Sequence, residues 1–241
     1  MIEEELQRII NFMEKIEYWF LEPRLLFIAL CHSSYVHEQK QKGRNDVISN
    51  ERLEFLGDSV IEMLLSDYLY KNFEEFSEGN MAKIKAAVAS EEALARVARD
   101  INLGEFLFLG RGEEITGGRD RDSILADALE AVIGALYLDG GFEVVKRVML
   151  PHFESYIKQV AEGKIILDHK TALQELTQAK YKALPRYVLV KEEGPSHMRK
   201  FTVEVRLKRK VLAVGEGTSI KEAEKVAAKL ALEKLKKEEN T

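Results

Sequence analysis

The spacing of the apolar residues changes once along this chain of 241 residues, near residue 160. Before that point apolar residues recur at helical spacing, with no alternation over a strand's length, which is typical of a mostly helical module. Glycine-containing breaks are expected at SEGN, LGRGEEITGGRD and LDGG. The helices predicted from this pattern are residues 3–14, 23–31, 49–71, 80–87, 90–99, 122–138 and 142–160.

After residue 168 the pattern mixes both periods. DHKTALQELTQAKYK is an amphipathic helix, YVLVKEE, FTVEVRLK and VLAVGEG predict three strands, and SIKEAEKVAAKLALEKL returns to helix. Every second residue from Phe201 to Leu207 is apolar, so these side chains share one strand face. Ser219 and Glu222 have capping-box spacing, which predicts the start of the last helix. The expected fold class is multidomain: an all-α module followed by an α-β-β-β-α module of the α+β class.

The two modules carry opposite net charge. From Asp168 onward 17 Lys and Arg stand against 11 Asp and Glu, whereas the preceding residues have 19 against 30, so a total of −5 divides into +6 and −11. This split predicts an acidic module with a basic appendage for a polyanion, although such lysines can also simply solvate a surface. We place the first module at 1–160, a linker at 161–167 and the basic module at 168–238.

Composition excludes several protein classes. A single cysteine, Cys31, excludes a disulfide framework and a cysteine-rich zinc site, and it favours a reducing compartment. The start, MIEEELQRII, is acidic where a signal peptide is basic, and the longest apolar run, AVIGALYL at 131–138, is too short to cross a bilayer. We therefore expect a cytoplasmic protein without membrane contact.

Acidic residues lie inside the most apolar helices. In NERLEFLGDSV, Glu51, Glu54 and Asp58 fall within roughly a 60° arc of one helical face, and Asp127 and Glu130 repeat the three-residue spacing on a second helix whose small residues allow close approach. If these helices face each other, the acids converge. Two unit charges at about 4 Å repel by roughly 4 kcal/mol at an effective dielectric constant near 20, so the cluster must take up protons or bind a cation. Oxygen ligands favour Mg²⁺, with Mn²⁺ as a substitute.

Each acid also has a structural explanation. Glu51 follows Ser49 and Asn50, a good helix cap, and the helix dipole stabilises an acid in the first turn. A distant base such as Arg24 could neutralise the acids further along this helix. Neither Glu-x-x-His nor His-Glu-x-x-His occurs at these positions, so other metal chemistries fit less well. GRGEEITGG, at 110–118, lacks the Gly-Lys-Ser/Thr ending of a phosphate loop, which favours a flexible connection.

NERLEFLGDSV closely resembles the signature of bacterial ribonuclease III, and the resemblance extends over nearly the whole chain. SEGNMAKIKAAVASEEALA is similar to the next segment of that family, and DSILADALEAVIGALYLD to its second acidic helix. Residues from DHKTALQE to AEKVAAKLAL are similar to its double-stranded RNA-binding domain. The resemblance implies a helical endonuclease domain that forms a homodimer, followed by an RNA-binding domain.

The resemblance also implies roles for individual acids. The positions that match the family's Mg²⁺-binding carboxylates are Glu54, Asp58, Asp127 and Glu130. Of these, Asp58 and Glu130 match the two that are named catalytic, while Glu51 and Glu78 match auxiliary acids around the cleft. Phe55 matches an aromatic residue that packs into the other subunit, and ordinary core packing is the alternative.

Three regions of the basic module match the family's RNA contacts. They are Thr171, Gln174 and Glu175 of the first helix, Pro195, Ser196 and His197 of the GPSH loop, and Lys221 and Lys225 of the last helix. An A-form duplex hides its base edges, so a protein reads 2′-hydroxyls and phosphates along one side, which favours RNA over DNA as the partner. Ile220 stands where many family members carry a lysine, so phosphate affinity is expected to be lower. The two lysines also suit a solvated helix face, and KRK at 208–210 a charged hairpin tip.

The function implied by the resemblance is a magnesium-dependent endoribonuclease specific for double-stranded RNA. Such an enzyme leaves 5′-phosphate and 3′-hydroxyl ends with a short 3′ overhang, and its substrates are ribosomal RNA precursors, some messenger RNAs and transfer RNA precursors. A non-catalytic double-stranded RNA-binding or ribosome-associated factor is the alternative from another class. The presence of all four carboxylates argues against that alternative.

Overall fold

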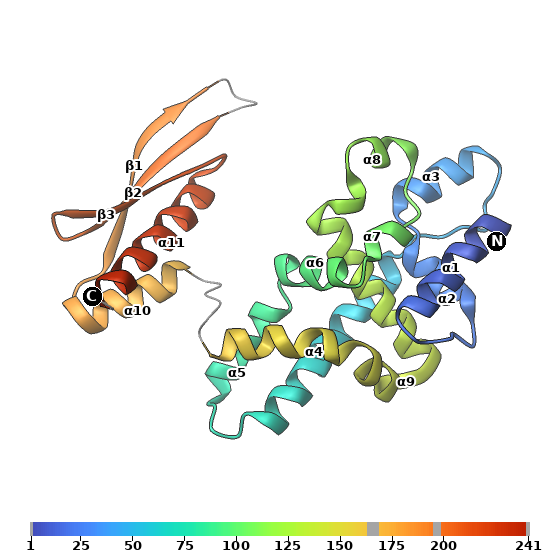
Figure 1. Ribbon diagram of the computed structural model, residues 1–241. Coiled ribbons are helices and arrows are strands. Elements are labelled where there is room, and N and C mark those ends of the chain that lie inside the picture. Colours follow the sequence, from blue (N-terminus) through green and yellow to red (C-terminus); the bar gives the residue numbers. More distant parts are fainter. Residues whose placement is uncertain (1, 163–168, 195–198, 240–241) are drawn as a thin grey trace. The chain divides into compact units, whose positions relative to one another are not determined.

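The computed structural model of the protein describes residues 2–162, 169–194 and 199–239, with side chains described up to residue 235 (Figure 1). These residues belong to two compact units, Met1–Lys164 and Ile165–Thr241. The first unit is helical, and the second has the order α-β-β-β-α, which confirms the expected fold class. Within the described ranges, no helix has the length and apolar character needed to span a membrane.

Helices α4 and α9 form the most extensive pairing of the first unit. Buried leucines line both sides of this pairing, including Leu64 and Leu65 of α4 and Leu129 of α9, and each contributes about 1.5–3 kcal/mol relative to an exposed position. The helices of this unit are α1 (Glu3–Lys15), α2 (Pro23–Leu30), α3 (Ser33–Gln41), α4 (Glu51–Asn72), α5 (Glu78–Val88), α6 (Glu91–Asp100), α7 (Leu103–Phe106), α8 (Arg111–Ile115) and α9 (Asp122–Ala161), with the 3-10 helix η1 at Gly118–Asp120.

Serine side chains fix the start of two of these helices. Ser77 accepts a hydrogen bond from the Asn80 amide at the start of α5, and Ser90 does the same for Ala93 at the start of α6. An N-cap oxygen of this kind satisfies an amide that has no partner within the helix. The helical pattern is interrupted between Asn72 and Glu78, so the break expected at SEGN, 77–80, lies slightly earlier in the chain, and its serine caps the next helix.

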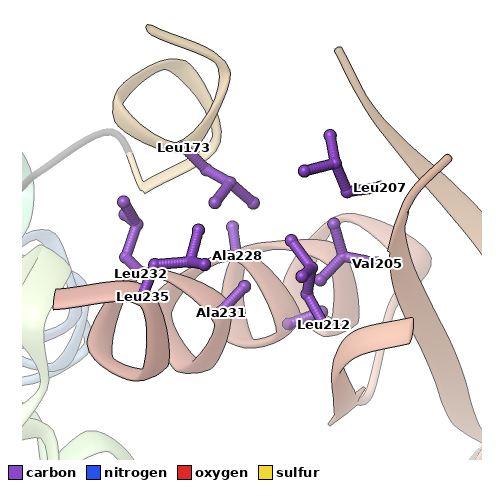
Figure 2. Packing of buried hydrophobic residues seen from close by; sticks show 9 residues of the cluster. Leu173, Val205, Leu207, Leu212, Ala228, Ala231, Leu232 and Leu235 are labelled. Atoms are coloured by element: carbon purple, nitrogen blue, oxygen red, sulfur yellow. The ribbon is translucent and has the colours of Figure 1, made fainter. Parts of the chain in front are cut away.

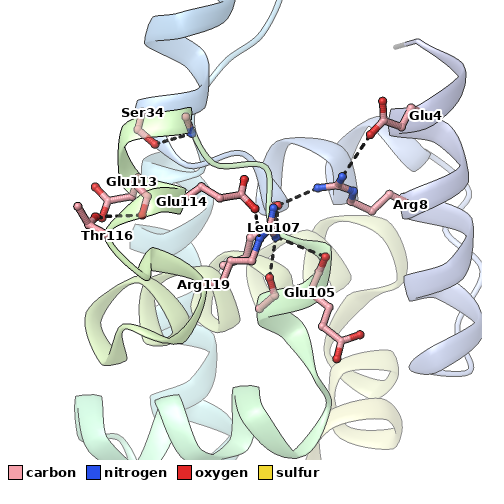
Figure 3. A network of polar contacts seen from close by, with 11 residues as sticks. Glu4, Arg8, Ser34, Glu105, Leu107, Glu113, Glu114, Thr116 and Arg119 are labelled. Carbon is pink, nitrogen blue, oxygen red and sulfur yellow. Dashed lines mark hydrogen bonds and ion pairs between the residues drawn. The ribbon is translucent and has the colours of Figure 1, made fainter.

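The segment at 110–118 was expected to be a flexible connection, and the structure corrects this. It contains α8, and Arg119 braces the chain around it (Figure 3). The Arg119 guanidinium donates hydrogen bonds to the carbonyl oxygens of Gly104 and Leu107, both at 2.9 Å, and to the Glu114 carboxylate at 2.6 Å. Arg8 donates to the same Leu107 carbonyl at 3.0 Å. These bonds replace the apolar packing that α8 lacks, since none of its residues is buried.

The long helix α9 is interrupted where LDGG was expected to break it. Gly141 adopts a φ of +77° and a ψ of −177°, outside the helical region. Just before the break, the Asp139 carboxylate accepts hydrogen bonds from the Tyr18 hydroxyl at 2.6 Å and from the amides of Leu21 and Glu22 at 3.0 and 2.8 Å. The break therefore places a side chain that anchors the connection between α1 and α2.

The second unit contains α10 (His169–Tyr181), β1 (Pro185–Glu193), β2 (Lys200–Leu207), β3 (Lys210–Gly217) and α11 (Ile220–Glu239). Its strands form an antiparallel sheet in the order β1-β2-β3, with Val205 paired to Tyr187 and to Ala213. Figure 2 shows Leu173 of α10 meeting apolar side chains of the sheet and of α11 in one core, to which the sheet contributes three buried residues and α11 five. The inward face predicted for the 201–207 segment is confirmed, since Val203, Val205 and Leu207 are buried.

The start of α11 follows the predicted cap with one difference. The Glu222 amide donates to the Ser219 hydroxyl oxygen at 3.2 Å, as a capping box requires. The Glu222 carboxylate, however, accepts from the amide and hydroxyl of Thr218, each at 2.6 Å. This pair of bonds lowers the pKa of Glu222 and holds the turn that leads into the helix.

Candidate active site and RNA-binding surface

Two glycines let the backbones of α4 and α9 approach closely. A Cβ atom on Gly57 would overlap the carbonyl oxygen of Glu130, and one on Gly134 would overlap the carbonyl oxygen of Leu53. The small residues of the second helix, Gly134 included, predicted this approach, whereas the matching glycine of the first helix was not anticipated. The crossing lies one residue from Asp58 and at Glu130 itself, so the backbone contact positions the acids.

The four predicted carboxylates share one electrostatic environment at this crossing. The pKa of Glu130 is raised to about 7, first by burial and then by the charges of Asp58, Asp127 and Glu54. The pKa of Glu54 is raised by burial and then by Asp127, Glu51 and Asp58. A negative charge raises the pKa of another acid only when the two groups are close. These mutual effects therefore indicate that acids of α4 lie near acids of α9.

Two residues near Asp127 were not singled out from the sequence. Burial raises the pKa of Asp127 first, followed by the charge of Glu91, while His32 opposes the rise. Glu91 lies in the first turn of α6, next to its Ser90 cap, where an acid is explained by the helix dipole. His32 is the N-cap residue of α3. Neither residue carried a sequence signal that distinguished it from an ordinary helix start.

The neighbours that shift the pKa of Glu54 and Glu130 are all acids, and Arg24 is not among them. In the described part of the chain, no three or more His, Cys, Asp and Glu side chains are close enough to hold a metal ion as they stand. The donors are carboxylate oxygens, and the pKa is raised at Glu54, Asp127 and Glu130. Such oxygen donors fit a hard divalent cation.

The auxiliary acids lie at the edge of this cluster or beyond it. Glu51 is exposed, accepts a hydrogen bond from the Ser49 hydroxyl at 2.9 Å and adds to the charge felt by Glu54. Asn50 occupies the N-cap position of α4 but makes no capping bond with its side chain. Glu78 is exposed in the first turn of α5.

Phe55 is 80% exposed, so ordinary core packing within one chain does not explain it. It lies on α4 one residue from Glu54, and it is one of the large apolar side chains that the first unit leaves on its surface. The ring therefore lies outside the core of the first unit.

The predicted RNA-binding residues lie on the two helices of the second unit, as far as they are described. Thr171, Gln174 and Glu175 are exposed on α10, and Lys221 and Lys225 are exposed on α11. An ion pair of 2.6 Å between Lys170 and Glu224 ties the start of α10 to α11 and so holds these two surfaces together. The predicted contacts of the loop, Pro195, Ser196 and His197, fall outside the described residues.

Comparisons with known proteins agree with this arrangement. The model of a Ribonuclease-III-like family matches residues 22–157, and that of the double-stranded RNA binding motif matches residues 169–235. Ribonuclease 3 of Pseudothermotoga lettingae is 67% identical over 98% of this chain and 99% of its own length. The chain belongs to the ribonuclease III family. A second member, Ribonuclease 3 of Caldanaerobacter subterraneus subsp. tengcongensis, is 51% identical over 92% of this chain and 96% of its own length.

The first unit also has a solved structural counterpart in the ribonuclease III family. The nuclease domain of ribonuclease III from Campylobacter jejuni is 38% identical, with a TM-score of 0.55 over 61% of this chain and 96% of that domain. Its title describes a region involved in dimer formation. Family membership makes the protein an endoribonuclease whose basic unit is a double-stranded RNA-binding motif.

Proposed function

We propose that the protein hydrolyses double-stranded RNA with a divalent cation, Mg²⁺ or in its place Mn²⁺, held by Glu54, Asp58, Asp127 and Glu130. The products are 5′-phosphate and 3′-hydroxyl ends with a short 3′ overhang, and the substrates are ribosomal RNA precursors, some messenger RNAs and transfer RNA precursors. The observation that carries the proposal is the pKa of Glu130, raised to about 7 by burial and by three neighbouring acids. A divalent cation would neutralise such a cluster.

The four carboxylates have different proposed roles. A bound cation supplies activation of water and neutralisation of charge on the phosphodiester. Asp58 of α4 and Glu130 of α9 are proposed as the catalytic carboxylates, and Glu54 and Asp127 complete the ligand set. Because Glu130 retains a proton in part of the molecules at neutral pH, cation binding releases that proton and makes apparent affinity rise with pH.

We also propose that the protein is a homodimer, with the surface around Phe55 of α4 as its interface. Phe55, exposed beside the acids of α4, is proposed to pack into a second copy of the nuclease unit, which gives two cleavage centres in one assembly. Glu51 and Glu78 are proposed as auxiliary acids at the edge of each centre. The basic unit, tethered to this dimer, raises the local concentration of duplex RNA at the centres.

The test is cleavage of a long RNA duplex with and without Mg²⁺. Glu130→Gln removes one charge without changing the shape of the side chain, so we expect cleavage to be abolished while binding of the duplex persists. Glu143→Gln, the same change at an exposed position of α9, serves as the matched control and should cleave normally. Unchanged cleavage by Glu130→Gln would defeat the assignment of the centre, and binding without cleavage by the unaltered protein would favour the non-catalytic alternative.

A further inference from the structure

A groove of about 650 Å³ lies between α3 and α8 in the first unit, apart from the α4–α9 crossing. Hydrogen bonds join its two walls: the Gly110 amide donates to the Ser34 hydroxyl oxygen at 2.9 Å, and the Arg111 amide donates to the Glu38 carboxylate at 2.9 Å (Figure 3 shows the Ser34 bond). Arg119 also holds α8 in place, because its guanidinium bonds both Glu114 of α8 and the carbonyl oxygens of Gly104 and Leu107. The shape of the groove is therefore set before any ligand enters.

Both acids that line the groove already have cationic or amide partners. The Glu38 carboxylate bonds Lys42 at 2.6 Å through one oxygen and the Arg111 amide through the other, and these bonds lower the pKa of Glu38. Glu113 forms an ion pair with Arg121. These cations reduce the repulsion between the two carboxylates and an anion in the groove.

Several other groups that line the groove can donate hydrogen bonds. Gln41 donates its side-chain amide to Nε2 of His37 at 2.9 Å, which leaves the proton of His37 on Nδ1. The Arg111 guanidinium is exposed and takes part in no ion pair or side-chain hydrogen bond with the described residues. Ser33 adds an exposed hydroxyl. One cation with several neutral donors around it is a combination that suits a phosphate group.

The chain at His32 connects this groove to the start of α4. Its Nδ1 accepts from the Ser34 amide at 3.2 Å and lies 2.7 Å from the Ser34 hydroxyl, so its other nitrogen, Nε2, carries the proton. The same ring lines the groove, and the carbonyl oxygen of the preceding residue, Cys31, accepts a hydrogen bond at 3.0 Å from the amide of Asn50, the N-cap residue of α4. The groove therefore adjoins the start of α4, the helix that carries Glu54 and Asp58.

We propose that the α3–α8 groove binds a backbone phosphate of the RNA strand next to the phosphodiester that is cut, with Arg111 supplying the charge and His37, Ser33 and His32 the hydrogen bonds. This rests on the proposed function. It assigns the segment at 110–113 a role in substrate positioning that its sequence did not indicate. Arg111 is a positioning residue here, because it holds a phosphate that does not react.

The first arm of the test compares Arg111→Gln with Arg24→Gln in the full-length protein. Arg24 is exposed on α2 and lies outside the groove, so it controls for the loss of one positive charge. We expect Arg111→Gln to raise KM for duplex RNA about tenfold with little change in kcat. The slope of log KM against log salt concentration should fall by about one, as for one lost phosphate contact. If Arg111→Gln behaves as Arg24→Gln does, the groove does not bind the substrate.

The second arm identifies the source of the phosphate. In duplexes that carry one neutral methylphosphonate linkage, moved step by step past the cleavage site, the unaltered protein should lose affinity at one or two linkages beside the cut. Arg111→Gln should lose nothing further at those same linkages, because the contact is already gone. Competition by inorganic phosphate that depends on Arg111, without any sensitive linkage, would overturn the assignment to the RNA backbone. Failure of the unaltered protein to cleave would instead refute the proposed function and the groove's role with it.

Discussion

Gly57→Ala tests whether the backbone contact between α4 and α9 holds the carboxylates in their working positions. The added Cβ must move by more than 1 Å before it reaches 3.0 Å from the Glu130 carbonyl oxygen, the shortest approach that real Cβ atoms show. Backbone atoms stand on both sides of this contact, so the helices must separate. Overpacking of this kind destabilises by about 1–3 kcal/mol, and a displacement of about 1 Å at a reacting centre lowers the rate about a hundredfold.

The assays for this variant are denaturant unfolding without divalent cation and single-turnover cleavage at saturating enzyme. Gly79→Ala is the matched control, because its Cβ would meet nothing within 4 Å and alanine should stabilise α5 by up to about 1 kcal/mol. Gly134→Ala, which overlaps the Leu53 carbonyl from the other helix, should reproduce the defect. The reasoning is wrong if Gly57→Ala unfolds more easily but cleaves at the normal rate, since packing and positioning would then be independent.

Three further outcomes can be measured on single variants. Without divalent cation, the folded state keeps the Glu130 proton between pH 4.5 and about 7, whereas the unfolded state releases it. The unfolding free energy should therefore fall by about 3 kcal/mol as pH rises through this window, and Glu130→Gln should flatten the profile. Equal unfolding free energies at pH 5 and pH 8 would contradict this. Burial opposes ionisation of Glu5, but hydrogen bonds from Arg44 and Tyr35 outweigh the burial and lower the pKa of Glu5 to about 2. The stability that Glu5 contributes is therefore present above pH 4.5 and lost as pH falls toward 2. Glu5→Gln should remove that acid transition in a calorimetric pH series. Lys221→Gln should reduce the slope of log Kd for duplex RNA against log salt concentration by about one, and an unchanged slope would exclude its phosphate contact.

The helical spacing of acids within apolar segments predicted a cluster of carboxylates on the condition that the two helices face each other, and the acids that shift the pKa of Glu54 and Glu130 are among those named from the sequence. Glu54 and Asp58 stand on one face of α4, and Asp127 and Glu130 repeat the spacing on α9, so a single helix–helix contact brings all four together. The same argument gave the alternation of β2 and the start of α11. The alternation of β2 and the start of α11 were predictable because each depends on residues within a few positions of one another, whereas the pairing of α4 with α9 was indicated by the small residues of α9 that allow a close approach.

Features that depend on contacts distant in sequence were missed. The short helix α8 buries none of its own residues and is held by Arg119, so no apolar period marks it. Helix α3 buries only Val36 and Gln39, which leaves its pattern too weak to read. Glu91 approaches Asp127 only because α6 packs beside α9. Periodicity reports how one helix meets the core, and it carries no information about which loop a distant arginine will bind.

Glu130 couples packing to charge, because its carbonyl oxygen lies against Gly57 while its carboxylate is repelled by the acids of both helices. A cation that neutralises these acids favours the close crossing, so Mg²⁺ should raise the unfolding free energy by RT ln(1 + [Mg²⁺]/Kd). Linkage requires the reverse as well: a variant that forces the helices apart must bind Mg²⁺ more weakly. Gly57→Ala should therefore show a higher Kd for Mg²⁺ by calorimetric titration, and an unchanged Kd would separate the ligand set from the crossing.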